Sequence, residues 1–252
     1  MRRKILILLA AMVAALIVPL GASAPASAST CSDPVWVTSS TNGMRSFGSY
    51  VVHNNMWNVS GYNVRETLSA CSAKNWRVAA TANNRSGDGA VKTYPNVHKD
   101  YHNWNTGHEP RLSSFATIRS SWAARTPRVG IYNAAYDIWL NGVPGNREVM
   151  IWTDNYRQTP AGRVVARNVQ LSGRTWKVYA TGDNSILTFL PATRLTHGTL
   201  RIKQHLDWLV SHGRVGSRAT LGQICFGFEI VSTGGNPARF KVDNFSVSTT
   251  RR

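Results

Sequence analysis

The 252-residue sequence is poor in carboxylates and in cysteine. It has 12 acidic residues against 29 Lys and Arg, which gives a formal net charge of +17. Three cysteines are too few for a disulfide-dense miniprotein, and 42% apolar against 16% charged residues argues against a coiled coil or a disordered chain. Glutamate occurs only as Glu66, Glu109, Glu148 and Glu229. Any chemistry that needs a glutamate is confined to these positions.

The first 28 residues have the three-part pattern of a secretory signal peptide. Basic residues at 2–4 precede an almost wholly apolar run over 5–20, and small residues lead to Ala28. A permanent anchor is the alternative, but the apolar run is short for a span of ~20 residues. We expect cleavage after Ala28, a secreted, extracellular mature chain over 29–252, and no membrane contact afterwards. Without the three basic residues of the leader, the mature chain has 26 basic and 12 acidic residues and a charge of +14.

Export permits disulfides, and three cysteines allow one bridge and one free thiol. We pair Cys31 with Cys71, which both lie near the N-terminus. Cys225 stands in an apolar strand pattern, which favours a buried, unreactive thiol.

Hydrophobic alternation with period two dominates the mature chain and predicts strands. The alternating segments are 48–54, 76–82, 115–122, 131–140, 147–153, 163–171, 174–181, 185–190, 199–203, 219–231 and 238–248. Only 203–212 has apolar residues at helical spacing, with Gly213 as a stop. Without an internal repeat or linker, the pattern predicts one all-β domain over 29–252, a two-sheet antiparallel sandwich or jelly roll with one short helix.

Three of the predicted strands bury one face and present acidic and aromatic side chains on the other. Because side chains alternate along a strand, Glu148 shares a face with Met150 and Trp152. Asp137 and Trp139 share the polar face of 131–140, and Glu229 lies opposite the apolar face of its strand.

Two carboxyl groups that flank a glycosidic bond can cleave it, and aromatic rings give pyranose faces a surface on which to stack. The alternative is that these carboxylates are solvent-facing and paired with Lys or Arg. The pattern alone leaves both interpretations open.

Four segments resemble glycoside hydrolase family 12, the small secreted endo-β-1,4-glucanases (cellulases) of jelly-roll fold. They are Asn-Asn-Met-Trp at 54–57, Tyr-Asp-Ile-Trp-Leu at 136–140, Glu-Val-Met-Ile-Trp at 148–152 and Gly-Phe-Glu at 227–229. They occur in the family's order and span most of the mature chain. Cys31 and Cys71 also lie where the family carries an N-terminal disulfide.

The resemblance implies a retaining double displacement in a cleft on the concave sheet. It makes Glu148 the nucleophile and Glu229 the general acid and then base, with Asp137 hydrogen-bonded to Glu148. This chemistry needs no cofactor or metal. It also implies substrate-binding residues along the cleft, which are Asn55, Trp57, His102, Trp139, Met150, Trp152 and Pro160. The substrate is then cellulose, a mixed-linkage glucan or xyloglucan, with loops 94–112 and 154–163 setting the preference.

The chain departs from the family pattern at Asn58, where glycine is usual, and at Val231, where a large group is usual. A non-catalytic carbohydrate-binding jelly roll therefore stays an alternative. The loop residues His98, His102 and His108 match no tight zinc spacing, so we expect no metal. The excess of basic residues suits nucleic acid in principle, but no nucleic-acid motif is present and export argues against such a partner. We expect a monomer that adsorbs to anionic cell-wall surfaces, more weakly at high salt.

Overall fold

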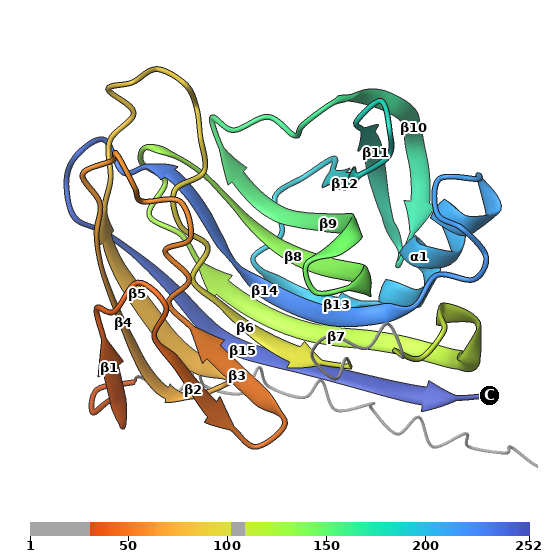
Figure 1. The fold of residues 1–252 in the computed structure, drawn as a ribbon, viewed down its shortest axis with the longest axis horizontal. Helices are drawn as coiled ribbons and strands as arrows, with labels where there is room; N and C mark the ends of the chain where they lie inside the picture. The colour runs from red at the N-terminus through yellow and green to blue at the C-terminus, as the bar shows by residue number, and fades with distance from the viewer. Residues whose placement is uncertain (1–30, 102–108) are drawn as a thin grey trace, which may run out of the picture.

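The computed structural model describes residues 31–101 and 109–252 as two stacked β-sheets (Figure 1). The six-stranded sheet has the order β1 (Trp36–Thr38), β4 (Arg65–Ser72), β5 (Asn75–Thr81), β15 (Ala238–Arg251), β7 (Phe115–Arg125) and β13 (His197–Leu200). The nine-stranded sheet has the order β10 (Arg163–Leu171), β11 (Arg174–Ala180), β12 (Ile186–Pro191), β9 (Gly145–Tyr156), β8 (Ile131–Gly142), β14 (Leu221–Ser232), β6 (Asn96–Asp100), β3 (Tyr50–His53) and β2 (Met44–Phe47). The predicted all-β, two-sheet sandwich is confirmed. Its strands pair antiparallel except for β12 with β9, which run parallel.

The core lies between the two sheets and is rich in aromatic side chains. Trp76 and Phe240 project into it from the six-stranded sheet, and Phe226 and Phe228 project from β14. These rings meet edge to face or tilted, as in the 5.7 Å contact between Trp76 and Phe228. Each buried aromatic ring contributes about 2–3 kcal/mol of transfer free energy, so the packing fixes which face of every strand points inward.

The predicted helix is confirmed as α1 (Ile202–Ser211), at one end of the sandwich (Figure 1). Its buried residues Ile202, Leu206 and Leu209 recur at the helical spacing of four and three. Gly213 follows with φ +67°, a conformation that ends helices at little cost for glycine. No helix in the described part of the chain is long and apolar enough to cross a membrane.

Hydrophobic alternation in the sequence did not predict four of the strands, which are β1, β2, β4 and β6. The first two are short and lie at sheet edges, where little apolar burial marks the sequence. In β4 an inward-facing Glu66 interrupts the apolar alternation, and β6 has only one aliphatic residue. The predicted strand at 199–203 is misplaced, because β13 ends at Leu200 and the following residues begin α1.

The disulfide between Cys31 and Cys71 is confirmed, with 5.7 Å between the Cα atoms. It fastens the first described residue to β4. Cys225 is a buried free thiol, as predicted.

Candidate active site

The carboxylates singled out in the sequence lie on the face of β8, β9 and β14 that points away from the core. In the β8–β9 pair, Trp139 lies opposite Glu148 and Asp137 lies opposite Met150. On the other side of β8, Asp137 lies opposite Cys225 of β14. Ala135, Met150 and Trp152 form a small apolar cluster of their own, separate from the main core. The acidic and aromatic side chains of β8 and β9 therefore share one face, as the alternation in the sequence predicts.

Glu229 lies on the same face of β14, opposite Asn133 of β8. The side-chain amide of Asn133 donates a short hydrogen bond to Oε2 of Glu229. Burial raises the pKa of Glu229 to about 7, although this hydrogen bond acts in the opposite direction. Glu229 therefore holds a proton to much higher pH than an exposed glutamate.

The pKa values of Glu148 and Asp137 are shifted in the same direction as that of Glu229. Burial and then the charge of Glu229 raise the pKa of Glu148 to about 7. Burial and then the charges of Glu148 and Glu229 hold the pKa of Asp137 well above its usual value. The charge of Glu229 acts on both other carboxyl groups and that of Glu148 acts on Asp137, so the three groups are electrostatically linked and retain protons near neutral pH.

Asp137 is held by a tryptophan rather than by the neighbouring glutamate. The side chain of Trp139 donates a hydrogen bond to its carboxyl group, and the Oδ1 atom is buried without a hydrogen-bond partner. The hydrogen bond to Glu148 that the family resemblance implies is absent between these two described residues. Their coupling in this structure is through charge.

Two side chains join the site that the sequence interpretation did not select. One is Asn133, which the alternation of β8 puts on the same face as Asp137, so the signal was available. The other is Tyr94, whose hydroxyl donates to the carbonyl of Ala135 at 3.0 Å. The pKa of Tyr94 is raised by burial and then by Cys225 and the three carboxylates, which shows that it lies among them. Tyr94 follows a turn-like stretch with no periodic pattern, so nothing in the sequence marks it.

The segment 54–57 is attached to the strand that carries Glu229. The carbonyl of Asn55 accepts hydrogen bonds from the backbone N–H of Tyr94 at 2.9 Å and from the hydroxyl of Thr93 at 3.2 Å. Thr93 in turn forms a β-bridge with Ile230, the residue after Glu229. Trp57 projects from this segment with 62% of its surface exposed. An exposed tryptophan beside a carboxylate-lined face is a suitable surface for stacking a sugar ring.

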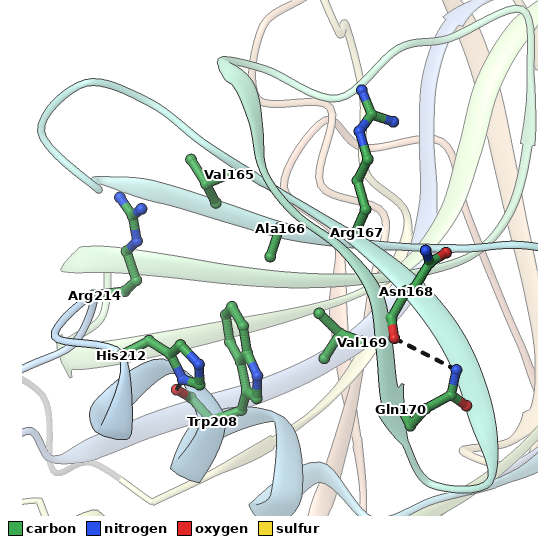
Figure 2. A pocket seen from close by; sticks show the side chains of 9 residues that line it. All are labelled: Val165, Ala166, Arg167, Asn168, Val169, Gln170, Trp208, His212 and Arg214. Atoms are coloured by element: carbon green, nitrogen blue, oxygen red, sulfur yellow. Dashed lines mark hydrogen bonds between the residues drawn. The ribbon is translucent and has the colours of Figure 1, made fainter.

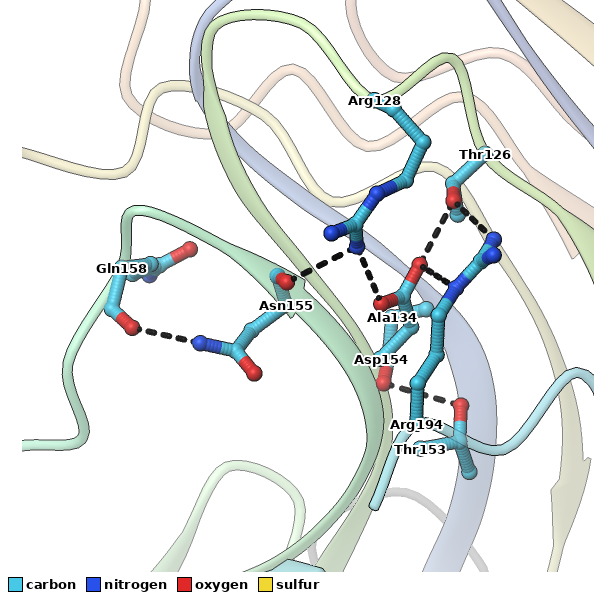
Figure 3. Close-up of polar contacts among 8 residues, drawn as sticks. All are labelled: Thr126, Arg128, Ala134, Thr153, Asp154, Asn155, Gln158 and Arg194. Atoms are coloured by element: carbon cyan, nitrogen blue, oxygen red, sulfur yellow. Dashed lines mark hydrogen bonds and ion pairs between the residues drawn. The ribbon is translucent and has the colours of Figure 1, made fainter.

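The end of β9 is fastened by a buried carboxylate, Asp154 (Figure 3). Arg128 and Arg194 reach its two oxygens at 2.9 and 3.1 Å, and the Thr126 hydroxyl donates at 2.6 Å. The next residue, Asn155, donates from its side chain to the carbonyl of Gln158 at 2.8 Å. The contacts of Asp154 with Arg128, Arg194 and Thr126, called the arginine clamp, therefore fix the end of β9, where the loop that contains the buried Pro160 starts. His102, the remaining predicted substrate contact, lies outside the described residues.

A cavity of about 440 Å³ between β10 and α1 contains none of these carboxylates (Figure 2). Trp208 and His212 stack there with ring centroids 3.9 Å apart. Among the described residues, no group of three or more His, Cys, Asp or Glu is arranged to hold a metal ion. The carboxylate face is therefore the part of the described structure with groups suited to acid–base and nucleophilic chemistry.

Comparison with known proteins gives a consistent result. A family model described as "Glycosyl hydrolase family 12" matches residues 48–250. Endoglucanase S of Pectobacterium parmentieri is 25% identical over 210 residues, covering 74% of this chain and 77% of that protein. The xyloglucanase domain of NopAA from Sinorhizobium fredii is 27% identical with a TM-score of 0.72, covering 86% and 100% of the two chains. Endoglucanase cel12A from Rhodothermus marinus is 24% identical with a TM-score of 0.74 and the same coverages.

Proposed function

The chain belongs to glycosyl hydrolase family 12, and on this premise we propose that it is a secreted, endo-acting β-1,4-glucanase that retains the anomeric configuration. Its substrate is cellulose or a related β-glucan, cut at internal linkages. The observation that carries the proposal is the placement of Glu148 on β9 and Glu229 on β14, the two strands that flank β8, on the sheet face that points away from the core.

In the first step, ionised Glu148 attacks the anomeric carbon and forms a glycosyl ester, while the bond to the leaving oxygen breaks. Glu229 gives its proton to that oxygen. Because Asn133 donates to Oε2 of Glu229, the other oxygen, Oε1, is free to carry the proton. In the second step, Glu229 takes a proton from water, the water oxygen attacks the anomeric carbon, and Glu148 leaves as a carboxylate.

The neighbouring carboxyl of Asp137 assists by staying protonated. Its pKa is held high by burial and by the two glutamates, so Asp137 adds no negative charge beside Glu148 at working pH. Attack on the anomeric carbon requires that the single negative charge of the glutamate pair lies on Glu148.

The proposed substrate contacts surround this pair. Trp57 stacks on a sugar ring, and Asn55 from the same segment hydrogen-bonds to hydroxyls on the glycone side. Trp139, Met150 and Trp152 line the floor beside the nucleophile. Pro160, in the loop after β9, is proposed to border the cleft, and His102, outside the described residues, stays a predicted contact.

Release of reducing ends from carboxymethylcellulose and barley glucan tests the proposal. The wild-type chain should cleave both, and Glu148→Gln should lose at least about 10⁴-fold in turnover with an unchanged melting temperature. Asp243→Asn serves as a control that should keep turnover, because the Asp243 side chain is also largely buried but lies on the other sheet. Binding of insoluble cellulose by the wild-type chain without any products would instead support the carbohydrate-binding alternative.

Xyloglucan stays a candidate substrate because the Sinorhizobium fredii relative is a xyloglucanase domain. Product profiles on cello-oligosaccharides, mixed-linkage glucan and xyloglucan oligosaccharides decide the preference. Secretion has its own test. Sequencing the N-terminus of the exported protein should find Ser29 first, because the proposed cleavage follows Ala28.

A further inference from the structure

The outward face of the six-stranded sheet carries many basic residues, and it is called the outer basic face here. On β4, β5, β7 and β15, alternate residues point into the core, and those between them point outward. The outward basic side chains are Arg65, Arg77, Arg119, Arg125, Arg239 and Lys241. They share this surface with serine and threonine hydroxyls, since Ser246 lies opposite Ser121 and Thr250 lies opposite Thr117. The surface is therefore cationic and rich in hydrogen-bond donors.

Carboxylates do little to neutralise this face. Within it, Asp243 binds Arg125 at 2.6 Å and Lys241 at 2.6 Å, so its charge is already shared by two cations. Asp33 lies at the margin, where its backbone carbonyl oxygen is 3.3 Å from Sγ of the disulfide-bonded Cys71. In the described part of the chain, neither Arg77 nor Arg239 forms an ion pair. Both guanidinium groups keep donors for an external anion.

A hollow of about 390 Å³ lies between these two arginines. The pairing register explains it, because Thr67, Ala79 and Arg239 form one row across three strands. Ala79 has only a methyl group, so the row dips between two larger side chains. The walls also include Arg77, Ser69 and Ser32. Two guanidinium groups and three hydroxyls around a shallow floor suit a carboxylate flanked by sugar hydroxyls.

The geometry points to this face as a binding surface for a carboxylated polysaccharide, a linear chain of uronic acid units. One carboxylate occupies the hollow at Ala79, and its neighbours along the chain meet Lys241 and Arg125 in the adjacent row. The described residues include no exposed aromatic on this face, so it lacks the stacking surfaces that single-stranded nucleic acid uses.

The outer basic face and the carboxylate face lie on opposite outer surfaces of the sandwich. Both can therefore be occupied together. If the chain is a β-glucanase, as proposed above, the outer basic face would retain it on an acidic polysaccharide matrix while the cleft stays open to neutral glucan. The binding itself does not depend on that activity.

Titration of the full chain with oligogalacturonate of defined length tests the inference. The double variant Arg77→Gln/Arg239→Gln should bind roughly tenfold or more weakly at low salt. The matched control Arg167→Gln/Arg218→Gln removes the same charge from exposed residues outside this face and should change binding less than about twofold. Equal losses in the two variants, or no loss in the first, would overturn the inference. So would tighter binding of a DNA oligonucleotide that is equally sensitive to the first variant.

Arg77 also donates to the carbonyl of Cys31, so its removal alone can weaken the fold. Ala79→Glu avoids this problem because it keeps both arginines and places a negative charge in the hollow. It should weaken oligogalacturonate binding by a similar factor, with Ala79→Gln as the uncharged control that binds more tightly than Ala79→Glu. Equal binding by these two variants would count against a carboxylate in the hollow.

The two proposals fail in different ways. Hydrolysis of neutral barley glucan should be unchanged in Arg77→Gln/Arg239→Gln, and oligogalacturonate binding should be unchanged in Glu148→Gln. Absent hydrolysis with intact binding would reject the glucanase proposal alone. Intact hydrolysis, together with oligogalacturonate binding that is unchanged in Arg77→Gln/Arg239→Gln, would reject this inference alone.

Discussion

At the scale of single residues, the chemistry depends on how protons are shared between Glu148 and Glu229. The pKa of each is raised to about 7, chiefly by burial. Turnover requires one carboxyl ionised and the other protonated, so the pair must carry one negative charge. The raised pKa keeps Glu229 protonated up to about pH 7, and the proton is lost above that pH.

We therefore predict a bell-shaped dependence of kcat/KM on pH with its maximum near neutral pH, where the acidic limb follows protonation of Glu148 and the basic limb follows loss of the Glu229 proton. Initial rates on soluble barley glucan from pH 3 to pH 10 measure it. Activity that still increases above pH 8 would contradict Glu229 as the proton donor.

Asn133 offers a second test at this scale. Its hydrogen bond lowers the pKa of Glu229, so Asn133→Ala should raise that pKa and move the basic limb of the pH profile upward. Turnover should also fall by roughly tenfold to a hundredfold, because the carboxyl loses its fixed orientation. A profile that keeps its basic limb, with only a lower melting temperature, would reduce Asn133 to a structural residue.

At the scale of elements, the arginine clamp on Asp154 ties the end of β9 to Thr126, Arg128 and Arg194, just before the loop that begins at Arg157. Asp154→Asn removes a buried charge from two partly exposed arginines, and should lower the free energy of unfolding by about 2–4 kcal/mol. It should also raise KM, because the loop with Gln158 and Pro160 borders the proposed cleft.

Asp243→Asn is the matched comparison, since Asp243 is also buried between two cations but lies on the outer basic face. It should lower the melting temperature by a similar amount and leave KM unchanged. Thermal denaturation and steady-state kinetics of both variants provide the readout. An equal change of KM in the two variants would show that the Asp154 clamp has no specific effect on substrate binding.

The elements also show what the sequence can predict. Strands with one apolar and one polar face, such as β8, β9 and β14, were predicted with the correct face inward. Alternation of this kind sets which way Glu148 and Asp137 point. β4 was missed because Glu66 faces inward on it, where it accepts a hydrogen bond from Thr93. A buried polar contact between distant segments leaves no periodic signal.

The site was predicted in the same uneven way. The alternation of each strand gives the face of a side chain, but only pairing register tells which residues become neighbours. Glu229 meets Asn133 because β14 lies beside β8, although 95 residues of the chain lie between them. Tyr94 enters the site through a nonperiodic segment, so it became visible only in the structure.

At the scale of the whole molecule, charge is distributed very unevenly between the two outer surfaces. One surface concentrates three carboxyl groups that retain protons, and the other displays basic side chains with one carboxylate among them. The mature chain's expected charge of +14 opposes self-association. In the described residues, large exposed apolar side chains are few: Val35, Val37, Met44, Trp57 and Val129.

We therefore predict a monomer over a wide concentration range. Sedimentation velocity at about 1 and 100 µM should give one species with the same sedimentation coefficient at low and moderate salt. A dimer that forms at the higher concentration would show that one of these faces is an interface between copies.

Covalent trapping tests the central claim, catalysis by Glu148 and Glu229, most directly. A 2-deoxy-2-fluoro cellobioside with a good leaving group should slow the second step and leave the sugar attached to the nucleophile. Mass spectrometry of the digested protein should find one added disaccharide, on the peptide that contains Glu148. A label on another carboxylate, or an active enzyme that releases products of inverted configuration without any label, would contradict the account.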